Sequence, residues 1–338
     1  MSEITESTEQ DADNLQNMKK TLYDTKVNDN GVQKSVWKMT METFGMAEGK
    51  TSESDILLSD VDEALSKLKS MIPETGDKWK FPVTPLKELD TTLDDILRCF
   101  VFWSNKVEED EGEPVYNVNK AFRRLENYAS WMYDHREDLT EPLTPESMAK
   151  PAKAWGMKFT HSEKTGHLMW FMDLGVIDLK AIQEELELKD SLRVFVWLSH
   201  IAILDPQAQK KGTMFIEGLA KLGMWESMTM IPMDLGTQLD RLTIGSLPLK
   251  MKSFYMFHAS RWIHIFMGLM KPFLSQKMRN RLIVIPDAED PEKTLFDLFG
   301  QECFPVDWAG LKGASQTDIV FGKYLKDVVE NPEAETEC

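Results

Sequence analysis

The sequence predicts an α/β fold with a mostly parallel sheet, preceded by a small all-helical domain. From residue 168 onward, short apolar runs typical of buried strands alternate with helical patterns. Between residues 55 and 140, apolar residues recur at helical spacing instead. With 338 residues, the chain is long enough for one large domain or two smaller ones, with a sizeable core.

The clearest strand–helix–strand unit runs from residue 252 to residue 285. Residues 252–258 form an aromatic, nearly all-apolar run, which predicts a strand buried on both faces. Residues 262–270 are apolar at almost every position, so this helix needs packing partners on two sides. Pro272 breaks or kinks the helix, and residues 281–285 predict a second buried strand. The two strands are expected to be parallel, with a right-handed crossover.

Other apolar runs and capping residues place the remaining elements of the α/β half. Strands are predicted at 168–172 and 212–220. Asp178 and Asp190 are the predicted N-caps of the helices that follow them. Helices are also expected around Trp225, at 236–247 and at 292–300.

In the helical half, three apolar stripes each follow residues suited to an N-cap. Ser59 or Asp60 precedes the first stripe, Thr92 the second and Asn117 the third. Residues 141–151 contain three prolines and are predicted to be a linker.

These patterns divide the chain into four segments. Residues 1–52 are polar and acidic with only isolated apolar residues, and we expect them to be disordered. Residues 53–150 are expected to form the helical domain and residues 151–325 the α/β domain. Residues 326–338 form an acidic C-terminal tail.

The composition excludes some classes of function. A formal net charge of −17 argues against a general nucleic-acid binder, because neutralising phosphates needs a basic surface. Cys99, Cys303 and Cys338 are scattered and odd in number, which fits a reduced intracellular compartment better than a disulfide framework. The N-terminus lacks the apolar core of a signal peptide, and no apolar run approaches the roughly 20 residues of a membrane span. We therefore expect a cytoplasmic protein with only peripheral, transient membrane contact.

The sequence offers no recognisable catalytic constellation. It contains no G-x-S-x-G elbow, H-E-x-x-H pair or dinucleotide-binding glycine run. The six histidines are dispersed, and the closest pair, His258 and His264, fits packing roles better than metal ligation. We therefore expect no enzymatic activity, no cofactor and no metal.

The segment LPLKMKSFYMFHASRWIHIFMGLMKPFLSQKMRNRL, at 247–282, resembles the core of the CRAL-TRIO lipid-binding family. The likeness is strongest to the branch of the alpha-tocopherol transfer protein and the cellular retinaldehyde-binding protein. Upstream, DDILRCF at 94–100 and YNVNKAFRRLENY at 116–128 resemble the small helical domain of that family. The resemblance implies an α/β domain whose sheet and helices form a lipid cavity, preceded by the helical domain.

A lipid carrier needs a concave, mainly apolar pocket, and alternate strand positions together with the resemblance indicate its lining. The expected lining residues are Leu192, Phe195, Ser199, Met214, Ile216, Leu242, Leu247, Leu249, Phe254, Met256, Ile263, Met267 and Met270. Phe195 stands where the tocopherol-binding branch has a small polar residue, which implies a narrower pocket. Glu217 stands where the family commonly has aspartate. For each lining residue, the alternative is ordinary core packing.

The aromatic helix at 262–270 resembles the mobile gate of the family. By that resemblance, Ile263, Met267 and Met270 cover the ligand. Aromatic rings suit a membrane interface. The expected membrane contacts are Trp225, Trp262, Phe266 and Leu269. The alternative is a crossover helix that is fully buried in protein.

Basic residues concentrate at the ends of the same unit. Lys250, Lys252, Lys277 and Arg281 resemble basic positions that recognise phosphoinositide headgroups in the tocopherol-binding branch. The alternative is that they are solvated side chains at the ends of elements.

We therefore expect a non-enzymatic carrier that encloses one hydrophobic small molecule or phospholipid and transfers it between membranes. It would dock on phosphoinositide-containing surfaces and would not bind nucleic acid. The second hypothesis is a lipid-sensing scaffold or regulator that presents lipid to a partner enzyme. Acidic segments such as residues 108–113 favour a protein partner for that role.

Overall fold

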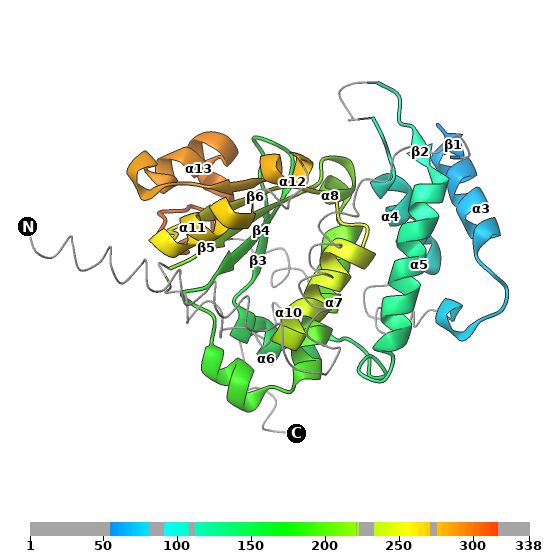
Figure 1. Cartoon of the computed structure of the whole chain (residues 1–338), viewed down its shortest axis with the longest axis horizontal. Coiled ribbons are helices and arrows are strands. Elements are labelled where there is room, and N and C mark those ends of the chain that lie inside the picture. Colours follow the sequence, from blue (N-terminus) through cyan, green and yellow to red (C-terminus); the bar gives the residue numbers. More distant parts are fainter. Residues whose placement is uncertain are drawn as a thin grey trace, which may run out of the picture. The chain divides into compact units, whose positions relative to one another are not determined.

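The computed structural model describes residues 55–80, 91–107, 112–220, 222, 233–270 and 276–316. All of them fall within the unit Thr43–Cys338. Figure 1 shows a sheet packed with helices in one part of this unit and the packed helices α3, α4 and α5 in the other. The α/β part and the all-helical part that the sequence predicts are therefore both present.

The sheet has the strand order β3-β4-β5-β6-β7. β3 pairs antiparallel with β4, and β4 to β7 run parallel to one another. The strands are Lys158–His161 (β3), Leu168–Asp173 (β4), Thr213–Gly218 (β5), Met251–Phe257 (β6) and Leu282–Val284 (β7). The mostly parallel sheet is thus confirmed, and β3 is the strand that the sequence pattern missed.

Helical crossovers connect the parallel strands, as the alternating pattern predicts. The connections are α7 and α8 between β4 and β5, α10 and η4 between β5 and β6, and α11 and α12 between β6 and β7. Their bounds are Leu188–Leu204 (α7), Pro206–Lys210 (α8), Met233–Asp240 (α10), Arg241–Ser246 (η4), Arg261–Met270 (α11) and Gln276–Arg281 (α12). After β7 come η6 (Asp287–Glu289), α13 (Pro291–Phe299) and η7 (Gln301–Cys303).

The three helices of the helical part begin at the predicted caps. They are Val61–Met71 (α3), Leu93–Trp103 (α4) and Val118–Asp134 (α5). Asp60, Thr92 and Asn117 each accept a hydrogen bond from a backbone N–H in the first turn. Two short antiparallel strands, Leu57–Leu58 (β1) and Tyr116–Asn117 (β2), precede α3 and α5, and a short turn, Asp77–Trp79 (η1), follows α3.

The linker prediction for residues 141–151 is wrong, because this segment enters the helix Pro145–Trp155 (α6). Thr144 and Ser147 form a reciprocal capping box. Pro145 occupies the first helical position, where a missing N–H costs nothing, and Gly156 ends the helix at a φ of 58°. The domain boundary expected at 150/151 therefore falls inside a helix.

Two other helix starts also differ from the predictions. α7 begins at Leu188 with Glu187 as its N-cap, and Asp190 closes the capping box from the third helical position. Asp178 does accept a hydrogen bond from the N–H of Ala181 at 2.9 Å. The segment after it, however, forms only the short π-helical turn Ala181–Glu185 (η3).

The two faces of the sheet are buried to different extents. We call the closed face the set Met169, Phe171, Ile216, Phe257 and Ile285, whose side chains are at most 2% exposed. It packs against α13 and residues 303–311. We call the open face the set Phe215, Glu217, Phe254, Met256, Leu282 and Val284, most of which are only half-buried. It lies on the side of α7, because Phe215 packs with the cluster that contains this helix.

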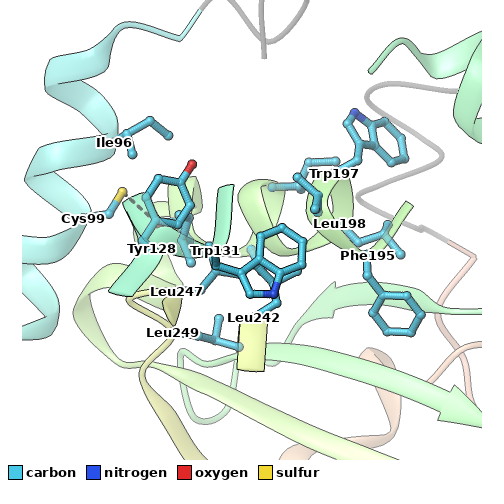
Figure 2. Packing of buried hydrophobic residues seen from close by; sticks show 14 of the residues in the cluster. Ile96, Cys99, Tyr128, Trp131, Phe195, Trp197, Leu198, Leu242, Leu247 and Leu249 are labelled. Atoms are coloured by element: carbon cyan, nitrogen blue, oxygen red, sulfur yellow. Dashed lines mark hydrogen bonds between the residues drawn. The ribbon is translucent and has the colours of Figure 1, made fainter. Parts of the chain in front are cut away.

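A buried joint connects α5 to α7 and η4. Figure 2 shows Tyr128 and Trp131 of α5 among the leucines at 242, 247 and 249. The hydroxyl of Tyr128 lies 2.7 Å from Nε2 of His200, and Nδ1 of His200 lies 2.6 Å from the carbonyl oxygen of Val196. A carbonyl only accepts, so Nδ1 carries the proton and Nε2 accepts from the tyrosine. Both ring nitrogens are therefore satisfied.

Candidate functional site

An aromatic ladder crosses the sheet on the side of the open face. The rings of Phe159 and Trp170 lie 4.6 Å apart, those of Trp170 and Phe215 lie 4.9 Å apart, and those of Phe215 and Phe254 lie 5.7 Å apart. These four residues come from β3, β4, β5 and β6 and are neighbours in register. The side of the sheet that α7 covers is therefore lined with flat apolar rings.

Burial along this ladder decreases from β3 to β6. Phe159 and Trp170 are fully buried, whereas Phe215 and Phe254 are half-buried. Leu282 and Val284 extend the half-buried apolar surface onto β7. The β5–β7 half of this face thus presents apolar side chains that are not fully packed by the described protein, as a ligand-binding surface would.

Glu217 is the charged residue on the open face. It pairs in register with Met172 on β4 and Met256 on β6, so its row is otherwise apolar. Its side chain is half-buried, yet protein surrounds it deeply enough that burial raises the pKa of Glu217 to about 7. Burial causes this shift, and among the described residues no hydrogen-bond partner or neighbouring charge contributes to it.

The strand residues expected to line one pocket lie on opposite faces of the sheet. Met214 and Ile216 pack with the closed face. Phe254 and Met256 belong to the open face, where their β5 neighbours are Phe215 and Glu217. These four residues therefore cannot all line one pocket, because sequence alternation groups residues by face but leaves undetermined which face is which. Phe215, which shares the open face with Phe254, was not among the expected lining residues.

The expected lining residues of α7 are all buried. Phe195 packs edge-on against Trp155 of α6 at 4.9 Å, and Leu192 is fully buried in the same cluster. Ser199 is completely buried, and its hydroxyl has no hydrogen-bond partner among the described residues. Buried hydroxyls are normally paired, so Ser199 is the member of this set that points to an additional group.

Leu242, Leu247 and Leu249 belong to the buried cluster that includes the joint with α5. All three are buried, and Figure 2 shows them around Trp131 and Tyr128. The carbonyl of Leu247 also accepts a 2.9 Å hydrogen bond from Nε of Arg124 on α5.

α11 has an exposed side and a half-buried side. Arg261, His264, Ile265 and Gly268 are exposed and recur at helical spacing. Ile263 and Met267, which are expected to cover a ligand, are half-buried. Because β4→β5 and β6→β7 are parallel crossovers in the same direction, right-handed crossovers are expected to put α11 on the side of the sheet that α7 covers.

The expected membrane contacts are only partly described. Trp262 is half-buried, and its indole N–H donates to the carbonyl of Leu222 at 3.0 Å, together with the hydroxyl of Ser260 at 2.7 Å. This tryptophan therefore also anchors the start of α11. Trp225 and the side chains of Phe266, Leu269 and Met270 lie outside the part that the structure describes.

The predicted basic residues gather at the amino ends of neighbouring strands. Lys250 directly precedes β6, Lys252 is its second residue, and Arg281 ends α12 directly before β7. Lys277 is also on α12, which packs against β6 and β7, but its side chain is not described. Lys210 and Lys211, just before β5, extend the group and were missed because they lie about 40 residues away in sequence.

Gly212 brings these segments together. Its φ is +95°, and a Cβ there would lie 2.5 Å from the carbonyl oxygen of Lys250 and 2.9 Å from Cγ of Lys252. Nζ of Lys250 donates to the carbonyl of Lys210 at 3.4 Å. We call Lys210, Lys211, Lys250, Lys252, Lys277, Arg279 and Arg281 the basic edge. A glycine is therefore required where the basic edge is most compact.

Within the described ranges, no three His, Cys, Asp or Glu side chains converge as a metal site requires. No helix there combines the length and the apolar character needed to cross a membrane.

Residues 156–310 match the CRAL/TRIO domain family. This match spans all strands from β3 to β7, and with them the open face and Lys250, Lys252 and Arg281 of the basic edge. Among solved structures, the chain is similar to the crystal structure of Sfh5, with 11% sequence identity and a TM-score of 0.37 over 59% of this chain and 68% of that one.

Proposed function

We propose that this chain, whose residues 156–310 form a CRAL/TRIO domain, binds one hydrophobic lipid against the open face and carries it between membranes. The family match supports lipid binding in general. The proposed role is that of a non-enzymatic carrier in the cytoplasm, associated peripherally and transiently with membranes. We assign lipid binding to the domain expected at residues 151–325 and place the helical domain, residues 53–150, before it. α6 spans the boundary between the two.

The observation that carries the proposal is the partial burial of the apolar open face. Phe215, Phe254, Leu282 and Val284 lie in a folded sheet, beneath crossover helices, and still retain accessible apolar surface. Exposed apolar surface in water costs about 25 cal/mol per Å². A bound acyl chain or isoprenoid would cover this surface and recover that free energy, while the half-buried Ile263 and Met267 of α11 would close over it.

Membrane docking is assigned to the basic edge. Seven basic residues from three chain segments gather there, although the whole chain carries a net charge of −17. The acidic remainder would be repelled by an anionic bilayer, so it would orient the basic edge towards the lipid. A phosphoinositide headgroup, with several negative charges, suits such a cluster.

Native mass spectrometry of the purified full chain tests the carrier role. One co-purified apolar molecule per chain, identified after organic extraction, is the expected result. A chain that stays empty after incubation with mixed liposomes would contradict the proposal and would leave the open face as loosely packed core.

Charge reversal tests the docking surface. Each basic residue near an anionic surface contributes about 1 kcal/mol, and reversal changes the charge by two units, so Lys250→Glu and Arg281→Glu are each expected to weaken binding to phosphoinositide vesicles about 30-fold. Lys67→Glu on α3 is the matched control, because Lys67 is exposed and far from the basic edge in sequence. Equal losses from all three variants would mean that only net charge matters and that no docking site exists.

A further inference from the structure

Glu217 combines three properties that rarely occur together in a folded protein. Its side chain is only partly buried, it has apolar residues on both neighbouring strands, and none of the described residues supplies a cation or hydrogen-bond donor that lowers its pKa. A second interior carboxyl of this chain, by contrast, is paired. Asp173 is buried one strand away and accepts backbone hydrogen bonds from Gly175 and Ala309.

The position of Glu217 within the open face is also specific. It lies two residues beyond Phe215 on β5, so it follows the aromatic ladder towards the carboxyl ends of the strands. A lipid lying along Phe215 and Phe254 would therefore have one end beside this carboxyl. Met172 and Met256 flank it and add adaptable apolar surface.

An unpaired interior carboxyl is destabilising by itself, because burial disfavours the charged form and leaves its oxygens without partners. An apolar residue at this position would complete the packing of the face. The natural explanation for a carboxyl in an otherwise apolar ligand surface is that the ligand supplies the missing hydrogen-bond partner.

We infer that Glu217 recognises a hydroxyl group at one end of the bound lipid, and that the carried lipid is therefore an uncharged alcohol such as a sterol, a long-chain alcohol or a diacylglycerol. This inference rests on the proposed carrier function and narrows its ligand class. A hydroxyl both donates and accepts, so it pairs with the carboxyl in either protonation state. An ether or a hydrocarbon offers no donor, and a fatty acid or phosphate would bring a second negative charge against the first.

The test compares three chemically matched probes on the full chain: stearyl alcohol, stearyl methyl ether and stearic acid. Binding is measured by native mass spectrometry and by competition at pH 8, where most Glu217 side chains are ionised and accept a hydrogen bond from the alcohol but cannot donate one to the ether. The wild type is expected to prefer the alcohol over the ether about tenfold, which is the value of one hydrogen bond to a charged group. Glu217→Leu is expected to bind both equally, because the recognising group is gone. Glu217→Gln is expected to retain the alcohol and to accept stearic acid, because the repelling charge is removed.

Glu74→Leu serves as the matched control. Glu74 is exposed in the turn after α3, and its substitution removes the same charge as Glu217→Leu. It should keep the tenfold preference. Glu217→Leu is also expected to raise the melting temperature of the empty protein, which shows that it folds.

Four outcomes would overturn the inference, and they separate it from the carrier function. Equal binding of alcohol and ether by the wild type leaves the carrier intact but removes the hydroxyl recognition. An unchanged preference in Glu217→Leu assigns the recognition to another residue. Binding of other lipids from mixed vesicles, with neither alcohol nor ether bound, removes the ligand class. Failure to bind any lipid removes the carrier function as well.

Discussion

His200 and Glu217 are both ionisable groups in the interior, and burial makes both of them neutral near pH 6. Burial lowers the pKa of His200 to about 4 and raises the pKa of Glu217 to about 7. They differ in their partners. His200 is fully buried, with one ring nitrogen bonded to Tyr128 and the other to Val196. Glu217 is half-buried, and the described residues give it neither a hydrogen-bond partner nor a compensating charge.

This difference in hydrogen-bond partners separates His200, a structural polar group, from Glu217, for which we propose a ligand as the partner. The joint between α5 and α7 contains aromatic rings, and its Tyr128, His200 and Arg124 side chains are hydrogen-bonded within the protein. A fully satisfied polar network makes such a joint rigid and unique. The open face has apolar surface and a carboxyl that the described residues do not fully cover, as the proposed lipid-binding function requires.

The largest expected effect comes from truncating one aromatic ring in each region. Tyr128→Ala should lower the free energy of unfolding by about 3–5 kcal/mol, because it opens a cavity and orphans Nε2 of His200. Phe254→Ala should cost less than half of that, since its ring is only half-buried, but it should weaken lipid binding. Urea denaturation measures the first quantity and native mass spectrometry the second.

Phe171→Ala on the closed face is the control for the sheet itself. Phe171 is fully buried against Phe304 at 5.3 Å and Trp308 at 4.9 Å, so its loss should resemble that of Tyr128→Ala. If Phe254→Ala destabilises the empty protein as much as Phe171→Ala does, the open face is ordinary core and the comparison fails.

The pH dependence of stability should show opposite signs for the two groups. The folded pKa of His200 lies below the unfolded value of 6.5, so its contribution is complete above pH 6.5 and is lost as the pH falls towards 4. That loss amounts to about 3 kcal/mol at 1.36 kcal/mol per pKa unit. The folded pKa of Glu217 lies above the unfolded value of 4.5, so its contribution is complete below pH 4.5 and is lost as the pH rises towards 7.

Single variants separate these two contributions to stability. In the wild type the two pH ranges overlap, and the two changes in the free energy of unfolding partly cancel. Glu217→Gln removes the carboxyl, so its stability should fall more steeply than that of the wild type between pH 6.5 and pH 4. His200→Gln should instead gain stability relative to the wild type over the same interval. Parallel curves for all three proteins, measured by urea denaturation at each pH, would contradict this account of the two groups.

Most helices and strands could be predicted from the sequence, because the residue patterns that indicate them are local. The helix starts at Asp60, Thr92 and Asn117 depend on side chains that cap the next turn. The strands β4, β5 and β6 are apolar runs of ordinary length. α6 was missed because its prolines suggested a linker, whereas one of them sits at a helix start, where proline is favoured.

The site was harder to predict, because it depends on which strand face meets which helix. Alternation separated Met214 from Phe215 correctly, but burial on both faces left no difference in polarity to identify the ligand side. Glu217 was the available signal: a charged residue inside an apolar strand identifies the face on which it lies. The basic edge was predicted in part, and Lys210 and Lys211 were missed because only the sheet order brings β5 beside β6.

The smallest expected effects come from removing two buried hydroxyl groups. The hydroxyl of Tyr128 contacts His200 of α7, and that of Ser199 belongs to the residue just before His200. Tyr128→Phe should lower the free energy of unfolding by about 1–3 kcal/mol, because it leaves Nε2 of His200 buried without a donor. Ser199→Ala, one residue away from His200, removes a buried hydroxyl that has no partner among the described residues and should be neutral or slightly stabilising in the empty protein. Urea denaturation of the two variants measures both values. A loss from Ser199→Ala as large as that from Tyr128→Phe would mean that the protein itself satisfies the serine. It would also contradict the argument that an unpaired polar group in this structure indicates a ligand. The contrast between His200 and Glu217 depends on that argument.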